Sequence, residues 1–158
     1  MKKILIVAVS FVMISGCASP RFTSEKVVST AHAGKDFVIV KDEKTREGFL
    51  SAVADWLKDN GHSYTIVGDG VSHDLEKVTI EYVGFWKWDL ALFLSEAKIE
   101  AFHEGQRIGE VDYRAPNTLS AVKFGEARDR IFYMMDVLFG KITPQEAAKE
   151  IKKSKSNQ

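Results

Sequence analysis

The residues of this chain whose types could do chemistry are few and widely spaced. His62, Asp69, His73 and Asp74 flank one expected hairpin, and imidazole and carboxylate groups are ligands that zinc accepts. Their spacings match no standard metal site, so the alternative is that all four are solvated loop residues. The chain contains no G-x-S-x-G, H-E-x-x-H or P-loop motif. These patterns favour a protein that is not an enzyme, and no metal or other cofactor is expected.

Cys17 is the only cysteine, and it follows a short apolar segment. The chain opens with Met1-Lys2-Lys3, continues with an apolar run over Ile4–Ile14, and then changes to Ser15-Gly16. A basic start, a short apolar run and small residues before a cut are typical of a secretory signal. The run is too short to span a bilayer core, which needs roughly 20 apolar residues. We therefore expect residues 1–16 to be removed as a signal peptide.

The segment that ends at Cys17 resembles the lipobox of bacterial lipoproteins, in which an aliphatic residue and two small residues precede the modified cysteine. The resemblance implies that the Cys17 thiol carries a diacylglyceryl thioether and that its amine is acylated. Several acyl chains hold a protein at a membrane where one chain binds reversibly. Ala18, in place of aspartate, implies sorting to the outer membrane, facing the periplasm. The alternative is a free thiol in an ordinary secreted protein.

Composition and charge limit the partners of the remaining chain. Loss of residues 1–16 takes two of the 22 basic residues and none of the 22 acidic ones, which leaves a net charge of about −2. No basic stripe is visible, so nucleic acid is not an expected partner. The length predicts one domain. A single cysteine that is committed to lipid cannot form an intramolecular disulfide, so packing must hold the fold.

The segment Phe85–Leu90 contains two tryptophans at a spacing that places both on one face of a strand. Tryptophan is enriched in the most energetic parts of protein interfaces, and it also anchors cores where its ring N–H finds an acceptor. Trp86, Trp88 and Asp89 are therefore candidate partner-binding residues, with packing at a strand corner as the alternative. The apolar surface of the last long helix is a second candidate partner surface, and deep burial of that helix is its alternative.

A wider pattern resembles a family of small, largely uncharacterised proteobacterial lipoproteins and extends over about Tyr82 to Phe139. The matching positions are Trp88-Asp89-Leu90 after the strand of Tyr82, then Ala97, Gly105, Ile108-Gly109 and Lys123-Phe124-Gly125 before the last long helix. Lys123-Phe124 stands where the family has Lys-Trp. No activity is assigned to this family, so the resemblance implies no catalytic residue. It supports only the lipid site at Cys17.

The periodicity of apolar residues predicts the elements that position these candidates. A helix over Thr45–Asn60 is stopped by Gly61, and a second helix begins between Ser120 and Glu126 and ends before Gly140. Strands are expected at 37–40, 63–67, 77–83 and in two further segments between 90 and 113. The change of parity between Leu94 and Ala97 predicts a bulge near Ser95. A three-residue turn, His103-Glu104-Gly105, is expected to join the last two strands.

These elements predict a two-layer α+β fold. We expect a mostly antiparallel sheet in the order strand, helix, four strands, helix, with the helices on one face. The expected divisions are a signal peptide over 1–16, a lipidated flexible tether over 17–34, the α+β domain over 35–142, and a short helix with a disordered tail over 143–158. Thr143-Pro144-Gln145-Glu146 predicts a capping box at the start of that short helix.

The sequence therefore predicts a lipid-anchored, periplasm-facing protein of the bacterial cell envelope that binds another envelope component and has no enzymatic activity. Its expected contacts are the membrane, through the lipid on Cys17, and an envelope protein. The alternative is a small-ligand binder, a metal-binding protein or an enzyme with a site near Trp88, Asp89 and the His62–Asp74 hairpin.

Overall fold

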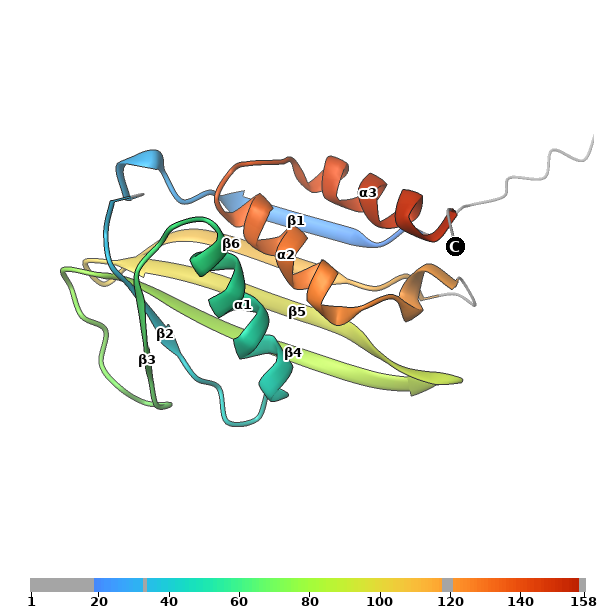
Figure 1. The fold of residues 1–158 in the computed structure, drawn as a ribbon, viewed down its shortest axis with the longest axis horizontal. Helices are drawn as coiled ribbons and strands as arrows, with labels where there is room; N and C mark the ends of the chain where they lie inside the picture. The colour runs from blue at the N-terminus through green and yellow to red at the C-terminus, as the bar shows by residue number, and fades with distance from the viewer. Residues whose placement is uncertain (1–18, 33, 118–120, 157–158) are drawn as a thin grey trace, which may run out of the picture.

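Three α-helices cover one face of a six-stranded sheet in the computed structural model, which describes residues 19–32, 34–117 and 121–156 (Figure 1). The strands are β1 (Arg21–Lys26), β2 (Phe37–Val40), β3 (Tyr64–Val67), β4 (Val78–Asp89), β5 (Ala91–His103) and β6 (Gln106–Arg114). The helices are α1 (Glu47–Asp59), α2 (Ala127–Leu138) and α3 (Pro144–Ser156), with 3-10 turns η1 (Thr30–His32) and η2 (Ala121–Phe124). The predicted two-layer α+β fold is confirmed.

The sheet has the order β1-β6-β5-β4-β2-β3 and is mixed. The pairs β1–β6, β6–β5 and β5–β4 are antiparallel, whereas β2 is parallel to both β4 and β3. The predicted hairpin between residues 62 and 74 is therefore wrong, because β2 lies between β3 and β4. All four residues of β2 are buried in the interior of the sheet, whereas β3 exposes Ile66 at the sheet edge.

The core lies between the sheet and the helices. The ring of Phe49 on α1 stacks on that of Tyr82 on β4, with 4.7 Å between their centroids. Inward-facing residues of neighbouring strands continue this layer, as in the pair Ile99 and Val111. The Nε1 of Trp56 donates a hydrogen bond of 2.9 Å to Asp136, which ties α1 to α2. Alternate burial over residues 95–101 of β5 leaves the opposite face of that strand to polar side chains.

The predicted flexible tether is wrong for residues 19–32. Arg21–Lys26 form β1, which pairs with β6, and Phe22 packs against Tyr113 with 5.1 Å between the ring centroids. The Val28 N–H then donates to the carbonyl of Leu138 at the end of α2. The folded domain therefore includes β1 instead of beginning at residue 35.

The C-terminal segment is more ordered than the sequence predicted. Thr143 and Glu146 form the expected capping box, because each accepts a hydrogen bond from the backbone N–H of the other. α3 then continues to Ser156, and Ala147 and Ile151 are buried in the core. The prediction of a disordered tail from Lys152 is wrong as far as Ser156.

The two predicted irregularities of the long strands have different outcomes. The bulge near Ser95 is confirmed: Phe85 pairs with Glu96 and Trp86 pairs with Leu94, so Ser95 is the extra residue. Its hydroxyl donates to the Phe85 carbonyl at 2.9 Å. The three-residue turn is wrong, because His103 pairs with Gln106 and only Glu104 and Gly105 lie between. Both have positive φ, of 52° and 73°, as a type I′ turn requires.

Candidate binding site on the β4–β5 arm

β4 and β5 run past the ends of the neighbouring strands as a two-stranded arm, which we define as residues 85–94 (Figure 1). β6 ends at Arg114, which pairs with Glu96 on one side and with Arg21 of β1 on the other. Beyond this row, β4 and β5 pair only with each other. An isolated hairpin is marginally stable in water, so the arm needs support from the rest of the domain.

The base of the arm receives that support from α1. Trp86 packs edge-on against Phe49, with 6.4 Å between the ring centroids, and its cross-strand partner Leu94 is buried. Arg46 lies over the Trp86 ring at 5.9 Å. The alternative reading of Trp86, packing at a strand corner, therefore describes its position. It anchors the arm to the core and presents little surface to a partner.

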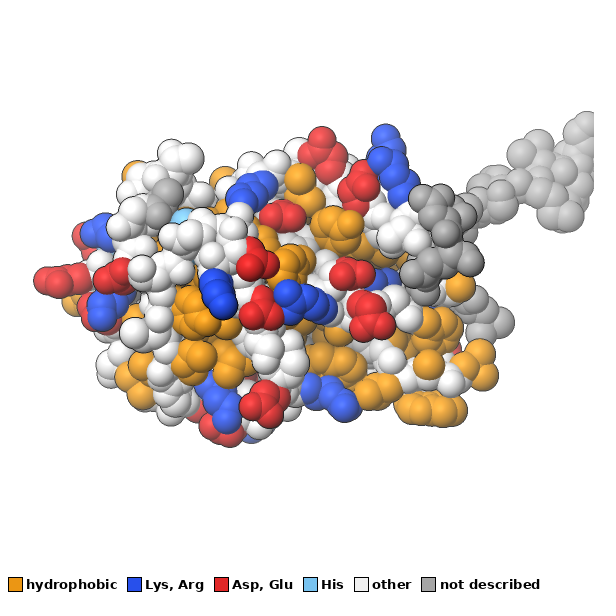
Figure 2. Space-filling model, in the orientation of Figure 1, with side chains coloured by type: hydrophobic (Ala, Val, Ile, Leu, Met, Phe, Trp, Pro, Cys, Tyr) orange, Lys and Arg blue, Asp and Glu red, His pale blue; other side chains and the backbone are white. Residues whose placement is uncertain are grey.

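Trp88 has the opposite environment, because the helix layer ends before it reaches this residue. Trp88 is 74% exposed, Leu90 76% and Leu92 46%, and Trp88 and Leu92 are directly paired across the two strands. Figure 2 shows hydrophobic side chains gathered at the end of the molecule where the arm lies. Phe85, at the base, is 56% exposed. Large contiguous apolar surface on a folded protein marks an interaction site.

Leu90 forms the tip of the arm in an unfavourable backbone conformation. It alone separates the paired residues Asp89 and Ala91, and its φ is +61°. The left-handed region costs a residue with a Cβ about 1–2 kcal/mol, and glycine or asparagine fills it more readily. Leucine therefore does not favour the fold here, since its backbone is strained and its side chain is exposed.

Asp89 is tied to η2 by an ion pair. The Nζ of Lys123 contacts the Asp89 carboxylate, and the Lys123 side chain is only 5% exposed. The same Nζ lies 5.3 Å from the ring centroid of Phe93 and 5.0 Å from that of Phe124. Asp89 is therefore the counter-ion of a buried amine that is flanked by two aromatic rings, and it fixes the η2 segment to the arm.

A buried arginine on α2 stabilises the segment that carries Lys123. Arg130 on α2 is 2% exposed and donates hydrogen bonds to the carbonyls of Val122, at 2.6 Å, and Glu126, at 3.1 Å. A Cβ on Gly125 would meet the Arg130 guanidinium. The two quoted segments Trp88-Asp89-Leu90 and Lys123-Phe124-Gly125 thus meet in space, and each residue of the second has a packing reason.

A cavity of about 320 Å³ lies beside the arm. Its charged lining residues are Arg21, Lys87, Asp89, Glu96, Arg114 and Lys123, and Trp88 forms part of its wall. Four of these are basic and two are acidic. Glu96 is paired with Lys87, at 3.5 Å, and with Arg114, at 3.2 Å, so the surface beside Trp88 carries a net positive charge.

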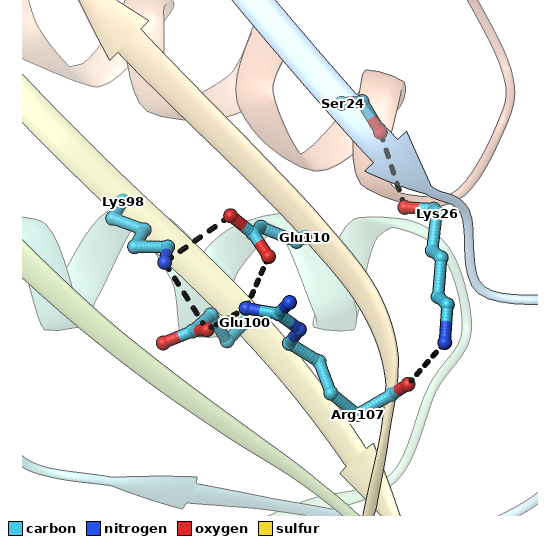
Figure 3. A network of polar contacts seen from close by, with 6 residues as sticks. All are labelled: Ser24, Lys26, Lys98, Glu100, Arg107 and Glu110. Carbon is cyan, nitrogen blue, oxygen red and sulfur yellow. Dashed lines mark hydrogen bonds and ion pairs between the residues drawn. The ribbon is translucent and has the colours of Figure 1, made fainter.

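The open face of the sheet carries a network of charged side chains in which basic and acidic groups contact one another (Figure 3). Glu100 and Glu110 are directly opposite each other on β5 and β6, where like charges repel. Lys98 and Arg107 each contact both carboxylates: Lys98 lies 3.3 Å from Glu100 and 3.1 Å from Glu110. These side chains satisfy one another, which gives the network a structural role.

The residues of the alternative metal or ligand site are separated in the structure. His62 packs among the rings of Phe37, Trp56 and Phe139, and the Nε2 of His73 lies 2.7 Å from Glu81. His73 also contacts Phe102 of β5, which pairs with Thr79 near the start of β4. Trp88 lies at the other end of β4. Within residues 19–32, 34–117 and 121–156, no group of three or more His, Cys, Asp or Glu side chains could hold a metal ion.

The remaining candidates show what sequence reasoning reached and what it missed. Cys17 lies outside the described residues. Trp88 and Asp89 lie together on the arm, as predicted, whereas Lys123, Leu90 and Leu92 were not singled out as site residues. The alternating leucines at 90, 92 and 94 were a signal for the strand but not for its exposure. No helix in the described part of the chain is long and apolar enough to cross a membrane.

Comparison with known proteins gives no independent assignment. No protein family, curated protein or solved structure matches this chain.

Proposed function

We propose that this protein is a lipid-anchored binding module of the bacterial cell envelope, with no enzymatic activity. Acyl chains on Cys17 hold it at a membrane, most simply the outer membrane with the domain in the periplasm, and the arm is its binding surface. The lipobox resemblance supports the anchor. The arm supports the binding role, because Trp88, Leu90 and Leu92 expose apolar surface that contributes nothing to the core.

The single observation that carries the binding role is Leu90. A leucine with φ of +61° that is 76% exposed is unfavourable for folding in both respects. Strain of this kind is found at functional sites more often than elsewhere, because the surrounding structure must hold it in place. Leu90 therefore lowers the stability of the domain, and a contact outside the domain would account for its presence.

The anchor is tested by mass spectrometry of the full chain purified from a bacterial host. We expect cleavage before Cys17, a mass increase that corresponds to several acyl chains, and sedimentation with membranes. The Cys17→Ser variant should lose both the added mass and the sedimentation. An unmodified Cys17 in membrane-extracted protein would remove the anchor from the proposal.

The binding role is tested by comparing Trp88→Ala with Leu75→Ala. Leu75 is 58% exposed in the loop before β4, far from the arm, and is a matched apolar control. We expect both variants to keep the melting temperature of the parent protein, because neither side chain belongs to the core. Photo-crosslinking from position 88, but not from position 75, should attach the protein to a component of native envelopes.

A second candidate function is the binding of a small anion in the cavity beside Trp88. Its volume of about 320 Å³ lies at the lower end of the usual range for ligand pockets, and its lining is net basic. Calorimetric titration with small carboxylates and phosphates tests it. Saturable binding that is lost in Arg114→Gln would favour this function over the first.

A further inference from the structure

The position of β1 relates the arm to the proposed anchor. Cys17 precedes Ser19, the first described residue, by two positions, and two residues of extended chain reach at most about 7 Å. Arg21, at the start of β1, lines the same cavity as Trp88. A bilayer that is held by lipid on Cys17 is therefore brought to the end of the sheet where the arm lies, and not to the end that carries Leu75.

We propose that the arm is a second membrane contact, with Trp88, Leu90 and Leu92 seated in the interfacial layer of the same bilayer that holds the acyl chains. The proposal rests on the proposed anchor at Cys17 and deepens it by naming the partner of the arm. Tryptophan favours the boundary between headgroups and acyl chains, where its ring is buried and its N–H remains in a polar layer. The two leucines lie at the same end of the arm and would enter the apolar side of that boundary.

The charges around the arm suit an anionic headgroup layer. Lys87, Arg21 and Arg114 lie beside Trp88, where they would meet lipid phosphates. Asp89, the acidic residue next to Trp88, has its charge compensated by Lys123.

Trp88 itself is the probe for the test. Full-length acylated protein is reconstituted into vesicles of phosphatidylethanolamine and phosphatidylglycerol whose acyl chains are brominated near the headgroup. Bromine quenches tryptophan only at close range, and Trp88→Phe identifies the contribution of residue 88 against Trp56 and Trp86. We expect a quenched component that is blue-shifted in unbrominated vesicles and that disappears in Trp88→Phe.

Two variants control for folding and for position. The double variant Leu75→Trp/Trp88→Phe carries its exposed tryptophan at position 75, at the opposite end of the sheet. No quenching of that tryptophan is expected. Leu90→Asn keeps the left-handed turn while it removes the apolar tip. It should reduce quenching of Trp88 without lowering the melting temperature. A variant that merely unfolds would lower both.

The outcomes separate the two proposals. Acylated Cys17 with an unquenched Trp88 overturns the membrane contact and leaves the anchor standing. Acylated Cys17 with Trp88 shielded only when an envelope protein is added assigns the arm to that protein and also overturns the membrane contact. Unmodified Cys17 with an unquenched Trp88 overturns both. Quenching that depends on residues 88 and 90 supports the contact.

Discussion

Lys123 and Asp89, 34 residues apart in the chain, form an ion pair in which the amine is buried between the rings of Phe93 and Phe124. This contact joins the arm to the segment that leads into α2. Asp89, although partly exposed, therefore has a structural role. The exposed Trp88 is its neighbour in the chain and so lies next to a residue that is held to the domain. The surface residues of the arm are therefore separable from the residues that hold it.

The ion pair predicts a marked non-additivity. Asp89→Ala leaves a buried, uncompensated amine and should cost about 1–3 kcal/mol of unfolding free energy. Lys123→Met removes the charge but keeps an unbranched chain between the rings, and it should cost less. The double variant should be more stable than Asp89→Ala alone, as measured by urea denaturation. Simple addition of the two losses would show that the pair contributes no coupling.

Leu90 predicts a gain in stability from a change that damages function. Leu90→Gly or Leu90→Asn should raise the unfolding free energy by up to about 1 kcal/mol, because both residues accept positive φ. Glu104, with φ of 52° in the β5–β6 turn, offers a matched control in which Glu104→Gly should have an effect of the same sign. A loss of stability in both Leu90 variants would mean that the leucine packs within the domain.

Gly125 predicts a loss of stability through Arg130. In Gly125→Ala, the added Cβ would displace the Arg130 guanidinium from the carbonyls of Val122 and Glu126. The unfolding free energy should fall by about 1–3 kcal/mol, because a buried charge loses its hydrogen bonds. Gly68→Ala is the control, since a Cβ there meets nothing within 4 Å. Equal melting temperatures for the two variants would contradict this role of Arg130.

The charged network predicts a dependence of stability on pH. Burial alone would raise the pKa of Glu100, but hydrogen bonds from Arg107 and Lys98 outweigh it and hold that pKa below its ordinary value. A lowered pKa in the folded state stabilises the protein above the unfolded-state pKa of about 4.3, and this contribution is lost as the pH falls through the folded-state pKa. Glu100→Gln should therefore flatten the decline in unfolding free energy between about pH 5 and pH 3.

Asp112 supplies a control of opposite sign for that experiment. Burial raises the pKa of its carboxyl above the ordinary value, against the attraction of Lys98, so its ionised form is disfavoured by folding. Asp112→Asn should increase the unfolding free energy at neutral pH and make little difference in acid. The pH profiles of the two variants should therefore diverge, and parallel profiles would contradict these assignments.

Strong periodicity explains which elements could be predicted from the sequence. The apolar stripe of α1, the alternation in β4 and the capping box of α3 are all local patterns, and each gave the correct element. The parity change at Ser95 likewise located a bulge. β1 was missed because Phe22 is the only apolar residue of its six, so an edge strand that is buried on one side leaves no periodic signal.

The features of the arm depend on contacts that are distant in the sequence. The spacing of Trp86 and Trp88 correctly indicated a shared strand, but their different exposure follows from where α1 begins, since Arg46 and Phe49 contact Trp86. Lys123 is buried only because Asp89 and two phenylalanines meet it from other segments. Asp89 is a residue type that favours turns, but the turn contains neither glycine nor asparagine, so the sequence did not indicate a left-handed residue at Leu90.

The placement of β1 has a mechanical consequence. It enters the sheet directly after residue 20, runs antiparallel to β6 and forms one border of the fold. Traction from the N-terminal side would act along the axis of the strand, so the rungs of its ladder would share the load in shear instead of opening one after another. The hydrogen bonds between β1 and β6 would therefore resist a pull on the domain together. β1 could leave the sheet only by moving along β6, and not by breaking one hydrogen bond at a time.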